Sequence, residues 1–214
     1  MSVDIPPRCA ELLAQGLAKM DIPASEENRE TLLKFLSLMV KWNAAYNLTA
    51  VRDPEEMVVR HLLDSLSVLP YVVGKYLLDV GSGPGLPGIP MAILRPEISF
   101  TLLDSNGKKI RFIRQAILEL GLKNIVAVQQ RVENFQPVER FHTITARAFT
   151  GLPRLFESTQ HLLRAKGRIV AMKGAASTIE KEMEGNRAAE VETVNLRVPF
   201  LNEERHLVIM RQNQ

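Results

Sequence analysis

The stretch LLDVGSGPGLPGIP, from Leu77 to Pro90, joins a short apolar run to a turn with four glycines and three prolines. The apolar run has the length of a buried strand. Glycine has no Cβ, so it lets the main chain turn sharply and lets a ligand come close to it. The stretch therefore predicts a strand that ends near Val80 and a turn that holds a ligand. The function depends on which ligand that is.

From this strand onward, short apolar runs alternate with longer amphipathic ones. The pattern predicts strands at 76–80, 99–104, 125–130, 141–147 and 167–173, and two more near 191–199 and 206–211. Helices are predicted near 88–94, 107–120, 151–165 and 175–186. Strands that alternate with helices form a mainly parallel sheet covered on both faces. We therefore expect an α/β, Rossmann-like fold with a seven-stranded sheet over residues 71–214.

The first 70 residues have a different pattern, in which apolar residues recur at helical spacing. Ser25 is a plausible helix start because its hydroxyl caps free amides. Asp53 is a second start, since Pro54 suits the first position of a helix. We expect residues 1–70 to form a helical extension packed on the α/β domain.

The glycine turn fits the dinucleotide pattern G-x-G-x-x-G only if the pattern begins at Gly83. That pattern requires its first glycine directly after the strand, and here the glycine in that place is Gly81. Pro84 and Pro87 also lack the amides that a pyrophosphate would use. The dinucleotide reading is therefore out of register.

A second pattern, D-x-G-x-G-x-G, runs through Asp79, Gly81, Gly83 and Gly85. An acid before the glycines would repel a pyrophosphate but suits a cation such as S-adenosylmethionine (SAM), which has a sulfonium and no phosphate. The next strand ends in Asp104, where an acid is able to accept hydrogen bonds from two ribose hydroxyls. Either acid could simply be a cap, but their placement after adjacent strands favours a SAM site.

The composition of the chain limits the classes of protein to which it can belong. The chain has 46% hydrophobic and 24% charged residues and a net charge of +3, which permits a nucleic-acid partner without requiring one. The single cysteine, Cys9, excludes an intramolecular disulfide. We see neither a membrane-spanning run nor a signal peptide. A cytoplasmic protein without a membrane partner is expected.

Residues that several methyl-transfer reactions need are missing. Methylation of a pyrimidine carbon uses a cysteine nucleophile, and Cys9 lies far before the glycine turn. Amine methylation uses an Asn/Asp-Pro-Pro-aromatic segment after the fourth strand, where this chain reads TARAF. A ring nitrogen needs only a positioned lone pair and an in-line sulfonium. We therefore assign no catalytic residue and no general base. The four histidines lack metal-ligand spacing, so no metal is expected.

Positive charge gathers in NGKKIRFIRQ, which contains Lys108, Lys109, Arg111 and Arg114. These residues either contact RNA phosphates or form a solvated helix face. The helical extension would supply one wall of a substrate cleft and place Asn47, Arg60 and His61 near the target base. The alternative for Arg60, His61 and Asp64 is a buried polar network that ties the extension to the sheet.

Five segments together resemble the RsmG family, also called GidB (glucose-inhibited division protein B). They are KWNAAYNLTAVRDPEEMVVRHLLDSL, DVGSGPGLPGIP, FTLLDSNGKKIRFIRQ, RVENF and ARAF. The resemblance implies a SAM-dependent methyltransferase fold, with methyl transfer to N7 of a guanine in the 530 loop of 16S ribosomal RNA. It also implies site residues: Gly81 and Leu86 line the cofactor, Val132 and Glu133 flank its adenine, Asp104 holds the ribose, and Arg147 closes the methionine end.

The implied partner is 16S rRNA, presented as the 30S subunit or as its assembly intermediate. A monomer is expected. Two other classes stay open at this point: an NAD-dependent oxidoreductase that uses the out-of-register glycine pattern, and a nonenzymatic RNA-binding protein on a decayed cofactor fold.

Overall fold

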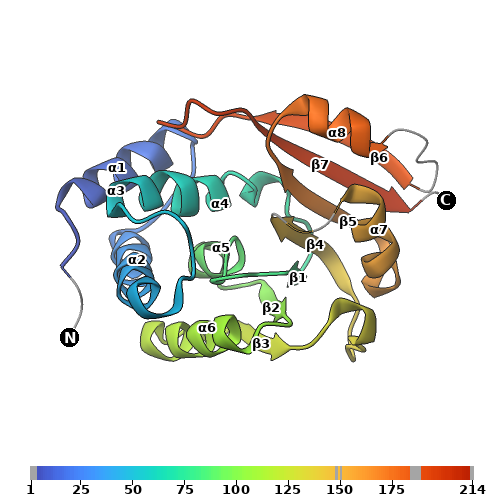
Figure 1. Ribbon diagram of the computed structural model, residues 1–214, viewed down its shortest axis with the longest axis horizontal. Coiled ribbons are helices and arrows are strands. Elements are labelled where there is room, and N and C mark those ends of the chain that lie inside the picture. Colours follow the sequence, from blue (N-terminus) through green and yellow to red (C-terminus); the bar gives the residue numbers. More distant parts are fainter. Residues whose placement is uncertain (1–3, 148, 150, 184–188, 213–214) are drawn as a thin grey trace.

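A single seven-stranded sheet forms the centre of the computed structural model, which describes residues 4–147, 149, 151–183 and 189–212 (Figure 1). The strands are β1 (Tyr76–Val80), β2 (Ser99–Asp104), β3 (Ile125–Gln129), β4 (Phe141–Arg147), β5 (Leu163–Lys173), β6 (Ala189–Leu196) and β7 (Arg205–Gln212). Their order is β3-β2-β1-β4-β5-β7-β6, and only β7 runs antiparallel to its neighbours. The expected α/β fold with a mainly parallel sheet is confirmed.

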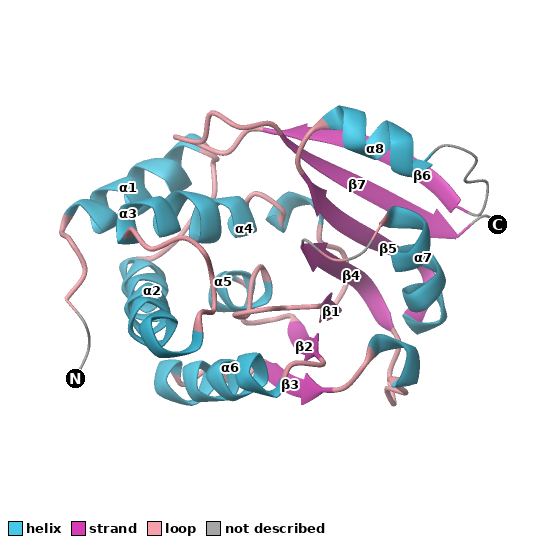
Figure 2. Ribbon diagram, viewed as in Figure 1, coloured by secondary structure: helices cyan, strands magenta, loops and turns pink. Residues whose placement is uncertain are grey.

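Helices cover both faces of this sheet. They are α5 (Gly88–Leu94), α6 (Gly107–Leu120), α7 (Leu152–Thr159) and α8 (Ala176–Met183), with short 3₁₀ turns η3 (Val132–Asn134) and η4 (Gln160–Leu162). Figures 1 and 2 show α5 and α6 on one side of the sheet and α7 and α8 on the other. The predicted bounds of α5 and α6 match the structure.

Three predicted boundaries are wrong. The helix expected at 151–165 ends at Thr159, and β5 begins at Leu163 rather than at residue 167. Leu163 pairs with Phe141 of β4, and the register then shifts before Arg168 pairs with Thr143. The strand expected at 191–199 ends at Leu196, before Pro199, which has no amide to continue a ladder.

The chain before the sheet is helical, as expected. It forms α1 (Arg8–Lys19), α2 (Glu26–Tyr46), α3 (Pro54–Met57), a π-helical turn η1 (Val58–Leu63), α4 (Asp64–Leu66) and a 3₁₀ turn η2 (Leu69–Tyr71). Ser25 Oγ accepts a hydrogen bond from Asn28 N at 3.1 Å and caps α2. Asp53 accepts from the amides that open α3. Both predicted helix starts are therefore correct.

Adjacent strand residues divide the core into two layers. Leu77 belongs to the same buried cluster as Leu13 and Phe35 of the N-terminal helices, whereas Leu78 belongs to the cluster that contains Phe156 of α7. This follows from the alternation of side chains along a strand. The N-terminal helices thus share one core with α5, α6 and a face of the sheet. No helix in the described part of the chain is long and apolar enough to cross a membrane.

Candidate functional site: a ligand pocket at the carboxyl edge of the sheet

The glycine loop starts immediately after β1. Gly81, Gly83 and Gly85 have φ angles of 66°, 57° and 85°, in the left-handed region that glycine adopts without strain. A Cβ on Gly81 would lie 2.7 Å from the Phe149 ring. A Cβ on Gly83 would meet nothing closer than 3.9 Å. The loop is therefore tightly packed at Gly81 and has space for a Cβ at Gly83, although Gly83 is itself buried and its amide donates to Asp104.

The Asp79 side chain points into the protein interior, where it supports this loop. Its side chain is fully buried, and its carboxylate accepts hydrogen bonds from Gly88 N at 3.0 Å and Thr145 Oγ1 at 3.1 Å. Burial raises the pKa of Asp79 to about 7, against the lowering effect of these hydrogen bonds. The expectation that Asp79 contacts a cation directly is therefore corrected: it fixes the junction between the loop and α5.

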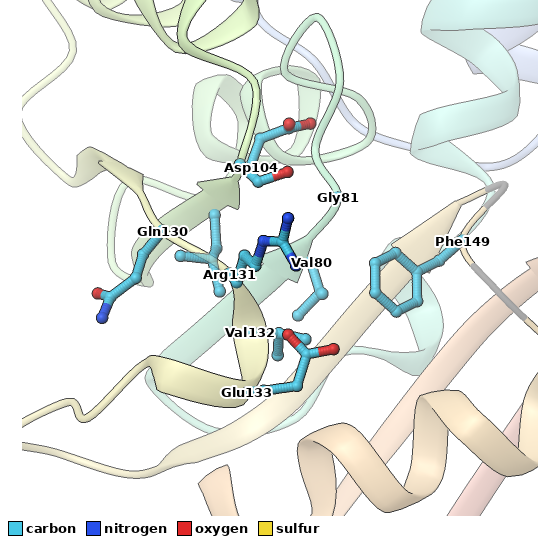
Figure 3. A pocket seen from close by; sticks show the side chains of 10 residues that line it. Val80, Gly81, Asp104, Gln130, Arg131, Val132, Glu133 and Phe149 are labelled. Atoms are coloured by element: carbon cyan, nitrogen blue, oxygen red, sulfur yellow. The ribbon is translucent and has the colours of Figure 1, made fainter.

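A pocket of about 280 Å³ opens where β1, β2 and β3 end (Figure 3). This is close to the lower bound, roughly 300 Å³, of typical small-molecule sites. The lining residues are Val80, Gly81, Leu103, Asp104, Ser105, Gln130, Arg131, Val132, Glu133 and Phe149. The structure thus brings four predicted cofactor residues into one pocket: Gly81, Asp104, Val132 and Glu133. Leu86 is not among the lining residues; its side chain is buried in the core.

Asp104 is the acid at the end of β2. Its Oδ2 accepts from Gly83 N at 2.9 Å and its Oδ1 from Asn106 N at 2.8 Å. Lys109 Nζ lies 4.0 Å from Oδ2. A carboxylate has about four acceptor positions, so two backbone bonds leave room for a diol. The acid is held rigidly between the glycine loop and the start of α6.

Six lining residues were not predicted from the sequence, among them Arg131 and Phe149. Figure 3 shows the Arg131 side chain between Asp104 and Glu133, with the Phe149 ring facing the pocket from the other side. Both lie inside segments that carry the family resemblance, RVENF and ARAF. Neither has a spacing signal of its own, because each lies in a loop whose course depends on the folded sheet.

Arg147, at the end of β4, does not line this pocket. Its Nη1 lies 3.3 Å from Asp64 Oδ2, and its Nη2 donates to His61 Nδ1 at 3.2 Å. A guanidinium only donates, so His61 Nδ1 accepts and Nε2 carries the proton, which points to Thr49 Oγ1 at 2.9 Å. Burial, and then the charge of Arg147, lowers the pKa of His61 to about 4. His61 is therefore neutral, with both nitrogens engaged.

The remaining substrate candidates from the N-terminal extension, Arg60 and Asn47, have different polar partners. Arg60 pairs with Glu56 and Glu203 and lines a different pocket of about 560 Å³. Its expected place near the target base stays a prediction; in this structure the two carboxylates hold its guanidinium. Asn47 ends α2 in the left-handed conformation, and its Oδ1 accepts from Arg52 Nη2 at 2.8 Å. His61 and Asp64 instead belong to a polar network between the N-terminal extension and the sheet, which was the alternative interpretation.

The charges of α6 face outward. Ile110 and Ile113 are buried, whereas Lys108, Arg111 and Arg114 are exposed. Lys109 is half-buried beside Asp104. This cationic face starts next to the pocket. Among the described residues, no three His, Cys, Asp or Glu side chains are grouped to hold a metal ion.

Strand order separates the two cofactor hypotheses. The dinucleotide fold has the parallel order 3-2-1-4-5-6. Here antiparallel β7 lies between β5 and β6, and α5 opens at Gly88, well after the first glycine of the loop. The NAD-dependent oxidoreductase alternative is therefore wrong.

Two solved structures share this fold. The N-methyltransferase NodS from Bradyrhizobium japonicum, in complex with S-adenosyl-L-homocysteine, matches with a TM-score of 0.55 and 16% identity, over 82% of this chain and 99% of that one. The glycopeptide N-methyltransferase MtfA, complexed with SAM, matches with a TM-score of 0.54 and 13% identity, over 72% and 88% of the two chains. At such identities the likeness shows the fold alone.

Sequence relatives are much closer. The ribosomal RNA small subunit methyltransferase G of Stutzerimonas stutzeri is 50% identical over 209 residues, 95% of each chain. That of Psychromonas ingrahamii is 45% identical over 202 residues, 94% of this chain and 98% of its own. The family model GidB, described as rRNA small subunit methyltransferase G, matches residues 28–208. The chain therefore belongs to the rRNA small subunit methyltransferase G (GidB) family.

Proposed function

We propose that this SAM-dependent rRNA methyltransferase methylates N7 of a guanine in the 530 loop of 16S rRNA. The observation that supports a ring nitrogen is the state of the titratable groups near the ends of β1 and β4. Asp79 is enclosed, Asp64 is paired with two arginines, and both nitrogens of His61 are engaged. These three groups are not poised as a general base, and attack by an in-plane lone pair requires none.

The pocket fits SAM without a phosphate-binding element. We assign the ribose hydroxyls to Asp104 and the adenine to Val132 and Glu133. We assign the amino-acid end of the cofactor to Gly81, which lines the pocket, and to Arg147, which follows Ala146 beside the end of β1. Gly85, Leu86 and Asp79 would act by shaping the loop.

Bound SAM would supply a methyl group on a sulfonium, so that a nitrogen–carbon bond forms while the sulfur–carbon bond breaks and its electron pair stays on sulfur. Guanine N7 loses no proton in this exchange. The protein therefore has to hold SAM and the guanine in line and exclude water. Its binding residues serve this positioning.

The RNA would approach along α6 and the end of α2. We assign phosphate contacts to Lys108, Arg111 and Arg114, which are exposed on the face that begins beside the pocket. Asn47 would lie at the rim, and the expected place of Arg60 near the base stays a prediction, whereas His61 is assigned to the polar network. An unpaired loop base costs less to present than a paired one. The proposed substrate is the 30S subunit or its assembly intermediate, met in the cytoplasm by a monomer.

The direct test is transfer of tritiated methyl from SAM to ribosomal RNA that lacks the modification, followed by mapping of the labelled nucleotide. We expect one labelled guanine in the 530 loop, and cleavage there by treatment specific for 7-methylguanosine. Label on an exocyclic amine or on a pyrimidine would contradict the N7 assignment. The Asp104→Ala variant, which should bind SAM poorly, serves as the control for contaminating activity.

A further inference from the structure

A buried carboxylate links the N-terminal helices to two strands of the sheet. Asp64, in α4 directly after the π-helical turn η1, is 3% exposed. Its Oδ2 lies 3.3 Å from Arg147 Nη1 of β4, and its Oδ1 lies 3.2 Å from Arg205 Nε of β7. Charges this deeply buried are stable only when paired. One acid thus serves two arginines on strands that are not neighbours.

Arg147 does not line the ligand pocket, but it lies beside residues that do. In the β1–β4 register Val80 pairs with Ala146, so Arg147 leaves its strand beside Gly81, the first residue of the glycine loop. Phe149, two positions further on, lines the pocket. Arg147 therefore connects the neighbourhood of the pocket with Asp64 and His61 of the N-terminal segment.

Groups from the N-terminal segment set the orientation of Arg147. Asp64 pairs with Nη1, and His61 accepts from Nη2. Nη1 is buried and makes no hydrogen bond, so the Asp64 carboxylate at 3.3 Å is what balances its charge there. An unpaired guanidinium here would repel the sulfonium of SAM, because both are cations in a region of low dielectric. Asp64 offsets that repulsion while it holds the guanidinium in place.

We propose that Asp64 is a positioning residue: it fixes and neutralises Arg147 beside the pocket, so that the N-terminal helices complete the SAM site. This rests on the proposed function only in taking SAM as the ligand. The rival explanation is purely structural, with Asp64 serving to anchor the helices to the sheet.

Arg205 provides the matched control. It also forms an ion pair with Glu203 at 3.1 Å and donates to the Glu204 carbonyl at 3.0 Å. Arg205→Met removes the second ion pair of Asp64 and leaves the Arg147 contact in place. A structural role predicts that Asp64→Asn and Arg205→Met affect SAM binding alike. A positioning role predicts that only Asp64→Asn weakens it.

The test is calorimetric titration of each variant with SAM, without RNA. We expect Asp64→Asn and Arg147→Met each to weaken SAM binding about tenfold, and Arg205→Met less than about twofold. The double variant Asp64→Asn with Arg147→Met should bind no more weakly than Arg147→Met alone, because Asp64 acts through Arg147. Losses that add in the double variant, or equal losses in Asp64→Asn and Arg205→Met, would overturn the proposal.

Folding is checked by circular dichroism and thermal unfolding of every variant. If Asp64→Asn does not fold, Asp64→Glu replaces it, since it keeps the charge but moves the carboxylate by one methylene. We expect Asp64→Glu to fold and to bind SAM several-fold more weakly; unchanged affinity in a folded Asp64 variant would also overturn the proposal. Because no RNA is present, these results are independent of which nucleotide is methylated.

Discussion

Asp104 has two tasks in the fold, since it accepts from two backbone amides and lines the pocket. We expect Asp104→Ala to weaken SAM binding ten- to hundredfold, because a hydrogen bond to a charged acceptor contributes roughly 1.5–3 kcal/mol. Calorimetry measures this. The control is Glu30→Ala, which removes an exposed acid of α2 and should leave the affinity unchanged. Equal affinity in wild type and Asp104→Ala would exclude Asp104 from the site.

His61 should not shape the pH dependence of methyl transfer. Its pKa is lowered to about 4, so it stays neutral at higher pH. In single-turnover reactions at saturating substrate, we expect a nearly flat rate between about pH 5.5 and 7.5, where an ordinary histidine would titrate. The His61→Asn variant should change the affinity for the substrates more than it changes the shape of the pH–rate profile. A one-proton loss of rate below neutrality that disappears in His61→Asn would show that a base participates.

Asp79 should make stability depend on pH. Its pKa is raised from 3.8 to about 7, so the folded protein binds more protons than the unfolded chain between these values. The stabilisation by protonated Asp79 is complete below the unfolded pKa of 3.8. It is lost progressively as pH rises from 3.8 through about 7. Relative to Asp79→Asn, which does not titrate, wild type should lose on the order of 1 kcal/mol of unfolding free energy per pH unit in this window. Urea unfolding at several pH values measures the difference; a constant difference would contradict the prediction.

At the scale of the element, α6 carries the test for RNA contact. Replacing Lys108, Arg111 and Arg114 by glutamine should weaken RNA binding and reduce its log–log salt slope by about 0.7–0.9 for each lost phosphate contact. SAM affinity should be retained, since Lys109, which lies beside Asp104, is left in place. Arg140→Gln with Lys166→Gln removes charge at the opposite end of the strands and is the control. An unchanged slope in the α6 variant would mean that its face is merely solvated.

Sequence patterns predicted elements well where one period dominates. In α6 the apolar residues Ile110 and Ile113 repeat at helical spacing and a glycine, Gly121, ends the helix in the left-handed conformation. The pattern failed after α7, because Leu162 at the end of η4 and Leu163 at the start of β5 are buried as well as they would be in an α-helix. Pairing with β4, which is distant in sequence, determines that this segment forms a strand.

At the scale of the whole molecule, the shared core predicts one unfolding transition. Leu13 of α1 is fully buried in the same cluster as Leu77 of β1. Leu13→Ala should cost about 2–5 kcal/mol, and this lowers the Tm by roughly 5–15 °C for a chain of this size. Trp42 fluorescence and circular dichroism should report the same midpoint. Leu118→Ala, at a side chain that is 75% exposed, should change stability by less than about 0.5 kcal/mol. Separate midpoints would show that the N-terminal helices unfold on their own.

The pocket was predictable in part, because the carboxyl ends of parallel strands meet at one edge. Gly81 and Asp104 follow adjacent strands, so their sequence positions implied their proximity. Asp79 was misassigned since strand alternation and the burial of its neighbours, not its position before the glycines, decide which way its carboxylate points. Arg60 and His61 are consecutive, yet they face different partners on the π-helical turn. Local sequence does not specify that divergence.

The place of β7 has a consequence for the order in which the sheet closes. This strand follows β6 in the sequence, but it lies between β5 and β6, and its residues Leu207 and Ile209 join the cluster that includes Leu13. Until β7 docks, β6 therefore has no neighbouring strand, and part of the apolar surface of the N-terminal helices stays uncovered. Removing residues 205–212 would leave a chain unable to join β6 to the sheet, so the insertion of β7 has to be a late step of folding.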